Sequence, residues 1–127
     1  GWLKAKHYAK TGQPLTKEIF LEIAETVEPN NKGKIRTTPV VFKNGGYAVP
    51  AHQLERGMEN LVRFWPEPTD SKETKLYWLK EMLVQHFYQD GNGRTAWVLQ
   101  QWLFNSWHKP KPLVDFGFNN KNFIANS

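Results

Sequence analysis

The sequence predicts a mainly α-helical fold, in which a single-domain bundle of helices carries one β-hairpin near a glycine-rich loop. Three observations predict it. Apolar residues recur at helical spacing in four segments, residues 16–27, 54–65, 71–85 and 95–107. An Asn-Gly-Gly tip joins two β-rich arms between residues 36 and 49. A polar run broken by glycines, residues 86–94, separates the last two helical segments.

Length and composition set the broad class. A chain of 127 residues can build one core but not two, so we expect one domain over residues 1–127, which could be part of a longer chain. An apolar fraction of 39% with six Trp excludes a disordered chain. The chain has no Cys, which excludes disulfides and thiolate metal sites. That composition suits the reducing cytoplasm, although a secreted effector would look the same.

The net charge of +5 comes from basic residues scattered along the chain, which is typical of a solvated surface. They could also steer a nucleotide or an acidic partner towards the protein. No recognisable nucleic-acid reader motif is present, and no apolar run is long enough to span a membrane. We therefore expect neither nucleic acid nor a membrane as a partner.

The first predicted helix follows Gln13-Pro14-Leu15-Thr16, with Thr16 as its N-cap. Its apolar stripe consists of Ile19, Ile23 and Val27. The turn-forming residues 29–33 end it. The hairpin comes next, with arms at 36–42 and 47–49. Pro39 and Pro50 confine it to a sheet edge or an isolated ribbon, and a purely structural ribbon would show the same pattern.

Three helices complete the predicted bundle. The helix at 54–65 ends at Pro66, and Asp70 or Ser71 caps the helix at 71–85. The last helix, 95–107, is stopped by Lys109-Pro110-Lys111-Pro112. Their apolar positions include three residues that we expect in the core, Trp65, Trp78 and Trp102.

The run His86-Phe87-Tyr88-Gln89-Asp90-Gly91-Asn92-Gly93-Arg94 combines groups that suit chemistry on a phosphate. His86 is a candidate general base for a hydroxyl nucleophile. Asp90 offers a hard oxygen ligand for Mg²⁺. Gly91, Asn92 and Gly93 would let the backbone approach a diphosphate. Arg94 could hold two phosphate oxygens and stabilise charge in a transition state.

Plainer interpretations of the same run also exist. A His at a helix end is often structural, and Asp-Gly-Asn-Gly is also ordinary turn chemistry. A Ca²⁺ loop starting at Asp90 would need an oxygen ligand at its fifth position and a Glu at its twelfth. Those positions hold Arg94 and Gln101, so the Ca²⁺ interpretation fails.

The run resembles the signature of the Fic (filamentation-induced-by-cAMP) family, His-Pro-Phe-x-Asp/Glu-Gly-Asn-Gly-Arg-x-x-Arg. The matching residues are His86, Asp90, Gly91, Asn92, Gly93 and Arg94. Gly33-Lys34-Ile35-Arg36 and the hairpin also resemble the segment that leads into the family's target-docking flap. The resemblance covers roughly residues 15–112. It implies a Fic-like helical bundle in the Fic/Doc superfamily.

The resemblance implies transfer of AMP, or a related phosphate-containing moiety, from a nucleotide such as ATP to a Ser, Thr or Tyr hydroxyl of a protein. His86 would deprotonate the hydroxyl, and Asp90 would hold Mg²⁺. Residues 91–94 would bind the leaving diphosphate. The target protein would dock on the hairpin residues, Val41, Phe42 and Tyr47.

Three positions depart from the signature. Phe87 stands for the Pro, and Tyr88 replaces the buried Phe while keeping an aromatic anchor. Trp97 stands where the second Arg of the signature is expected. In the family, that Arg binds the terminal phosphate of ATP and is the residue that an inhibitory Glu contacts. Trp97 could line the nucleotide site or only pack, and its presence leaves room for a donor with two phosphates.

Regulation and reaction type stay open at this point. The family's inhibitory motif, Ser/Thr-x-x-x-Glu-Gly/Asn, is absent, so inhibition would come from an antitoxin chain, from a segment outside this sequence or by another route. A Doc-like kinase toxin is an alternative, but that branch typically carries Lys where this chain has Gly93. A non-catalytic nucleotide- or protein-binding module is the third interpretation.

Overall fold

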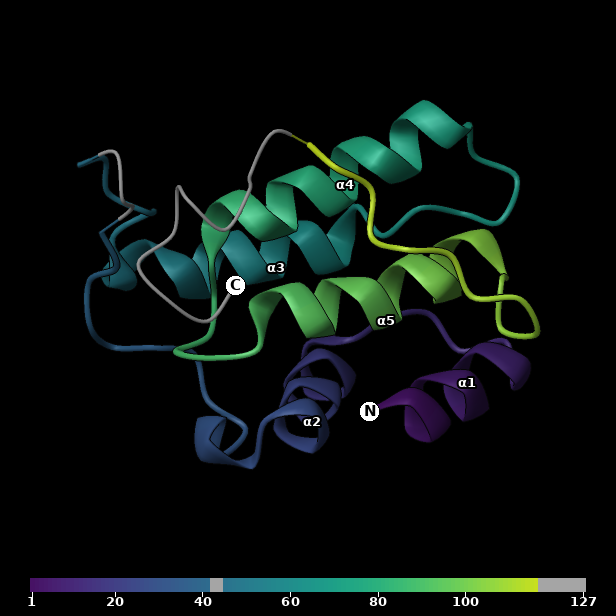
Figure 1. Cartoon of the computed structure of the whole chain (residues 1–127), viewed down its shortest axis with the longest axis horizontal. Helices are drawn as coiled ribbons and strands as arrows, with labels where there is room; N and C mark the ends of the chain where they lie inside the picture. Colours follow the sequence, from purple (N-terminus) through teal and green to yellow (C-terminus); the bar gives the residue numbers. More distant parts are fainter. Residues whose placement is uncertain (42–44, 117–127) are drawn as a thin grey trace.

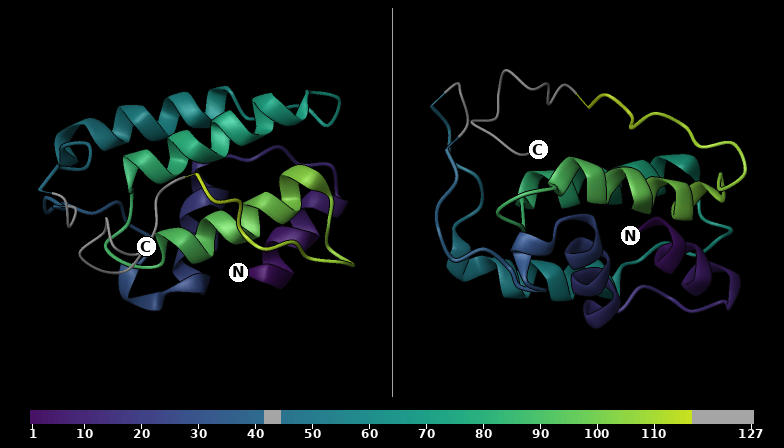
Figure 2. Two further views of the ribbon diagram at one scale, coloured as in Figure 1. Left: turned by 45° about the horizontal axis from the view of Figure 1, so that its top comes forward. Right: turned by 60° about the horizontal axis from the view of Figure 1, so that its bottom comes forward.

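The computed structural model describes residues 1–41 and 45–116, which form a helical bundle (Figure 1). The helices in chain order are α1 (Trp2–Lys10), α2 (Lys17–Val27), the 3-10 helices η1 (Pro29–Asn31) and η2 (Ala51–Gln53), α3 (Leu54–Arg63), α4 (Lys72–Gln85) and α5 (Asn92–Phe104). Helices α3 and α4 run side by side, α5 lies along α4, and α1 and α2 cover the other side of α5 (Figures 1 and 2). The prediction of a mainly helical fold is confirmed.

Helix α2 begins where the sequence predicted. Thr16 has extended backbone geometry, and its side-chain oxygen accepts a hydrogen bond from the Ile19 N–H at 3.1 Å. Ile19 and Ile23 are buried, while Val27 is partly buried at the helix end. The predicted apolar stripe therefore faces the core.

Helices α3 and α4 also follow the predicted pattern, but α3 ends at Arg63 and not at residue 65. Leu54 and Met58 of α3 are fully buried. Ser71 rather than Asp70 caps α4, because the Ser71 hydroxyl accepts from the Thr74 N–H at 3.1 Å. The Asp70 carboxylate instead accepts from the Glu67 N–H and closes the preceding turn.

Helix α5 is shifted relative to its prediction at both ends. It begins at Asn92 instead of residue 95 and ends at Phe104 instead of residue 107. The early end follows from Asn105, whose left-handed backbone (φ 49°) terminates the helix. Apolar periodicity alone locates neither of these backbone events.

Helix α1 is absent from the sequence-based prediction. Lys and His make up four of its nine residues, WLKAKHYAK, and leave only a narrow apolar face. That face still packs, since Ala5 is fully buried. The Tyr8 hydroxyl donates to the Glu22 carboxylate at 2.9 Å, and Lys4 pairs with the same carboxylate at 2.5 Å. These contacts fix α1 to α2.

The three tryptophans expected in the core form one aromatic cluster. Trp78 is buried, with its indole N–H donating to the Leu61 carbonyl at 2.7 Å. Trp65 lies between Trp78 and Trp102, with ring centroids 4.8 and 5.2 Å away and edge-to-face geometry. Trp65 and Trp102 are only partly buried, so they pack against the core rather than within it.

The predicted hairpin is represented by a single antiparallel bridge between Val41 and Tyr47. The Ala48 N–H also donates to the Val40 carbonyl at 2.9 Å. Phe42 lies outside the described residues. Within residues 1–41 and 45–116 no strand is assigned, so the β-hairpin flap stays a prediction. Pro39 and Pro50 lack an N–H and limit how far a ladder could extend.

None of the helices in the described ranges combines the length and the apolar character that crossing a membrane requires.

Candidate phosphate-handling site

The run that carries the motif forms the connection between α4 and α5, residues 86–91. Because α5 starts at Asn92, the last three motif residues lie in its first turn. The first N–H groups of any α-helix lack an intrahelical acceptor, and no side chain caps those of α5. Such an end, with the positive pole of the helix dipole, favours an anion.

Arg36 holds the first residue of this connection in place. The guanidinium is buried and donates to four carbonyls, those of Thr38 (2.7 Å), Val49 (2.6 Å), Gln85 (3.2 Å) and His86 (2.5 Å). The Arg36 N–H also donates to the Phe87 carbonyl at 2.8 Å. One side chain thus fixes the end of α4, the loop and the segment that leads to Val41.

His86 has left-handed backbone geometry (φ 53°) and is 2% exposed. Its burial, together with the nearby positive charge of Arg36, lowers the pKa of the imidazole from its ordinary 6.5 to about 4. The imidazole is therefore neutral at pH 7. A neutral imidazole is the protonation state that a general base requires.

Phe87 and Tyr88 anchor the connection in the core. Both are fully buried, and both meet Phe20 of α2 edge-to-face, at 5.6 and 5.8 Å between ring centroids. The Tyr88 hydroxyl donates to the Phe20 carbonyl at 3.3 Å, and burial raises the pKa of this phenol. The departures from the family's Pro and Phe are therefore accommodated as core aromatics.

The side chain of Asn92 faces the protein interior. Its amide donates to the Tyr88 carbonyl at 2.7 Å and accepts from the Tyr88 N–H at 3.0 Å. Asn92 is fully buried, so its side chain is committed to shaping the loop. The whole residue is buried, its backbone included, and of residues 91–93 Gly93 is the one that is partly exposed.

Gly91 lies where the loop meets the end of α2. Its φ of +75° is left-handed, and a Cβ there would come within 3.2 Å of the Glu28 Cβ and 3.4 Å of the Val27 Cγ1. Both the conformation and the close approach favour glycine.

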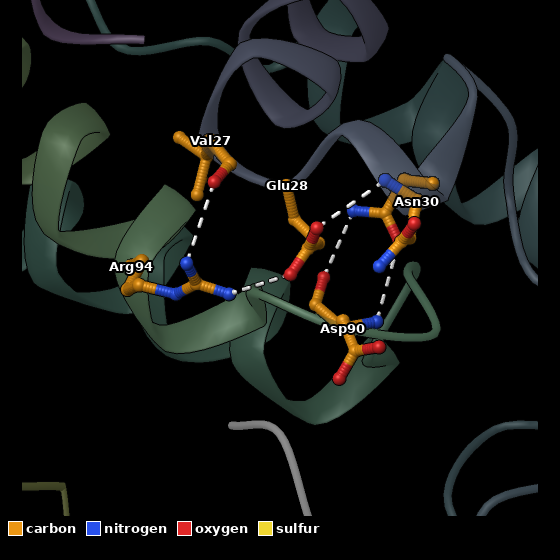
Figure 3. A network of polar contacts seen from close by, with 6 residues as sticks. Val27, Glu28, Asn30, Asp90 and Arg94 are labelled. Atoms are coloured by element: carbon orange, nitrogen blue, oxygen red, sulfur yellow. Dashed lines mark hydrogen bonds and ion pairs between the residues drawn. The ribbon is translucent and has the colours of Figure 1, made fainter.

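Arg94 leans against the same end of α2 (Figure 3). One guanidinium nitrogen is 3.4 Å from the Glu28 Oε1, and another donates to the Val27 carbonyl at 3.4 Å. The Arg94 side chain is 59% exposed, whereas that of Glu28 is 21% exposed. Arg94 is thus accessible to a ligand but lies beside a carboxylate.

Asp90 is the candidate metal ligand. Figure 3 shows its carboxylate pointing away from Glu28, while its backbone groups bond towards η1. Among the described residues, no three His, Asp or Glu side chains gather closely enough to hold a metal ion by themselves. A single carboxylate still fits Mg²⁺, which usually takes one or two carboxylates together with substrate phosphates.

Trp97 packs against α1. Its ring stacks on that of Trp2, with centroids 5.3 Å apart and 28° between planes, and Trp2 meets Trp107 edge-to-face at 5.0 Å. Trp97 remains partly exposed. Trp97, which occupies the position of the family's second Arg, therefore packs against α1 in this chain.

The segment leading to the candidate flap is tied to the loop by a second contact besides Arg36. The Thr38 hydroxyl donates to the Gln89 side-chain oxygen at 2.7 Å. Tyr47 is 74% exposed and Val41 is partly buried. Tyr47 is therefore available for contact with another molecule.

A cavity of about 710 Å³ lies at the opposite end of α5, lined by Lys10, Arg63, Trp65 and Phe104 among others. No residue of the 86–94 run lines it. The shape of the surface alone would favour this cavity as a ligand site. The candidate base His86, the carboxylate of Asp90 and the uncapped start of α5 instead occur together in the α4–α5 connection.

The fold and this loop together define the class: a helical bundle with a glycine-containing loop, residues 86–91, between the helices α4 and α5. The family model described as Fic/DOC family matches residues 14–104, well over half of the chain. The protein therefore belongs to the Fic/DOC family, as the motif resemblance led us to expect. Members of this family generally transfer nucleotide or phosphate moieties. A search of curated proteins found no match.

Two residues that contact the loop had no role in the sequence-based prediction, Glu28 and Asn31. Both come from Glu28-Pro29-Asn30-Asn31, which the sequence marks only as a helix end. The Glu28 side chain caps η1 by accepting from the Asn30 N–H at 3.2 Å. A Glu before Pro is a recognisable cap, but its proximity to Arg94 depends on tertiary packing.

Proposed function

We propose that this protein is a protein adenylyltransferase, which moves AMP from ATP to a Ser, Thr or Tyr hydroxyl of a target protein. The observation that carries the proposal is the α4–α5 connection, where a neutral buried His86 precedes an uncapped helix start whose first turn carries the accessible Arg94. Family membership supports a transferase of this general kind.

In the proposed reaction His86 takes the proton of the target hydroxyl. The hydroxyl oxygen forms a bond to the α-phosphorus, and the bond from that phosphorus to the bridging oxygen of pyrophosphate breaks. The N–H groups at the start of α5 and the Arg94 guanidinium stabilise the leaving pyrophosphate. Positioning and electrostatics supply most of the catalysis in such transfers.

Asp90 would hold Mg²⁺ together with the phosphates of the donor. Bound there, the ion would offset negative charge on the leaving group. The target would approach over Val41, Phe42 and Tyr47, where an extended peptide could add to the bridge as a strand.

A radiolabel experiment tests this proposal. The protein is incubated with Mg²⁺, cell lysate and ATP that is labelled at either the α- or the γ-phosphate. We expect α-label on protein, and we expect His86→Ala to reduce it by about 10²-fold or more, because it removes the general base. His52→Ala, an exposed His outside the loop, is the matched control.

Other outcomes point to the alternatives. Retention of γ-label instead would identify a Doc-like kinase. No label in either case, with His86→Ala indistinguishable from the unmodified protein, would contradict both enzyme interpretations and leave the binding module. The binding module is favoured by one observation: Trp97 stacks on Trp2 at the position where the family has a phosphate-binding Arg.

A further inference from the structure

Asn31 is a buried polar side chain with an unusual pair of contacts. It is 6% exposed and lies on η1, 59 residues from its partner in the sequence. Its side-chain N–H donates to the Asp90 carbonyl at 2.9 Å, and its side-chain oxygen accepts from the Asp90 N–H at 3.3 Å. Both halves of the amide thus bind the two backbone polar groups of one residue.

Asn31 is itself held firmly. Its backbone N–H donates to the Glu28 carbonyl, and its own carbonyl accepts from the Lys34 N–H, each at 3.0 Å. All four of its polar groups therefore have a partner in the protein. The side chain that contacts Asp90 projects from a fixed point and not from a loose loop.

Fixing both backbone groups of a residue fixes the direction of its Cα–Cβ bond. Asp90 lies between Gln89, whose side chain bonds to Thr38, and the left-handed Gly91, and neither of these contacts restrains the backbone polar groups of Asp90 directly. The bonds from Asn31 supply that restraint. A Mg²⁺ ligand needs such restraint, because the ion demands near-ideal octahedral geometry.

We infer that Asn31 is a positioning residue, which directs the Asp90 carboxylate through its reciprocal bonds to the Asp90 backbone. This inference rests on the proposed function for the assignment of Asp90 to Mg²⁺. The restraint of the Asp90 backbone by Asn31 follows from the two hydrogen bonds and does not depend on that function.

Asn92 shows what a purely loop-shaping amide does. It binds Tyr88 in the same reciprocal way, but Tyr88 is fully buried, and its side chain contacts the protein interior. Asp90 is partly exposed, so the same restraint there orients a group that a ligand can reach.

The test compares Asn31→Ala and Asn31→Asp with Asn30→Asp. Asn31→Ala removes both bonds. Asn31→Asp keeps the size of the side chain but loses the donor to the Asp90 carbonyl. Asn30→Asp adds the same charge one residue away on an exposed side chain, and it serves as the matched control.

Transfer is measured against Mg²⁺ concentration, and hydrogen exchange of the Asp90 amide is measured without nucleotide or metal. In both Asn31 variants we expect the Mg²⁺ concentration for half-maximal transfer to rise about tenfold or more. In Asn31→Ala the Asp90 amide should exchange faster, while the amide of the buried Leu99 keeps its rate. Asn30→Asp should match the unmodified protein.

A merely structural role would increase exchange throughout α5 and leave the Mg²⁺ dependence unchanged, which would overturn the inference. Unaltered exchange at Asp90 in Asn31→Ala would overturn it as well. If the unmodified protein transfers nothing, the proposed function fails, and exchange at Asp90 still decides whether Asn31 restrains this residue. If Asn31→Ala does not fold, the Mg²⁺ dependence of Asn31→Asp gives the decision.

Discussion

Arg94 is held by two long contacts to the end of α2 and is largely open to solvent (Figure 3). An exposed ion pair of this kind contributes only about 0–1 kcal/mol. A phosphate group, with its higher charge and with nearby N–H groups, can therefore draw Arg94 away from Glu28. Glu28 acts as a weak internal competitor for the same guanidinium.

Glu28→Gln should increase the affinity for nucleotide. Gln can still accept from the Asn30 N–H, but it neither pairs with the Arg94 charge nor repels a phosphate. We expect the Kd for ATP, measured by calorimetry, to fall by about two- to fivefold. Glu25→Gln, which removes the same charge from an exposed position on α2, should leave the Kd unchanged. A weaker affinity in Glu28→Gln would show that Glu28 orients Arg94 instead of competing for it.

The motif residues themselves were predictable from the sequence, whereas the residues that hold them were not. His86, Asp90 and Arg94 lie within nine residues, so one local pattern predicts that they share a loop. Arg36 and Asn31 contact this loop from 50 and 59 residues away. Nothing local distinguishes a buried Asn that bonds to Asp90 from an exposed Asn in a turn.

At the scale of elements, the site is a junction between the end of α2 and the start of α5. Gly91 lies at this junction, where an added Cβ would come close to Val27 and Glu28. The sequence predicted α2 well, because Thr16 and the Ile19–Ile23 spacing are local signals. It placed the start of α5 three residues late, because glycine usually argues against helix, and yet Gly93 is accommodated in the first turn.

Gly91→Ala tests this junction. The left-handed φ should cost about 1–2 kcal/mol for any residue with a Cβ. The contacts at 3.2 and 3.4 Å to Glu28 and Val27 should add about 1 kcal/mol or more. The free energy of unfolding, measured with urea, should fall by the sum of these two terms.

Gly12→Ala is the matched control for that substitution. Gly12 has the same φ of +75°, but a Cβ there would meet nothing within 4 Å. Its cost should therefore be the conformational part alone. Equal losses in the two variants would show that the α2–α5 junction yields to accommodate a methyl group.

For the whole molecule, the buried His86 couples stability to pH. The unfolded chain binds a proton on this imidazole near pH 6.5, whereas the folded protein binds it only near pH 4. Between these values the unfolded state holds more protons, so the folded state loses stability as the pH falls. Above pH 6.5 both states are neutral at this group, and its contribution is constant.

The free energy of unfolding should therefore fall by about 3 kcal/mol through His86 between pH 7 and pH 4. Urea titrations across this range measure the fall, and carboxylates contribute to it as well. His86→Gln isolates the imidazole, because the difference between the variant and the unmodified protein must shrink or reverse as the pH falls. His108→Gln, at an exposed position, should show the slope of the unmodified protein. A slope in His86→Gln equal to that of the unmodified protein would mean that the His86 imidazole accepts its proton equally well in the folded and unfolded chains.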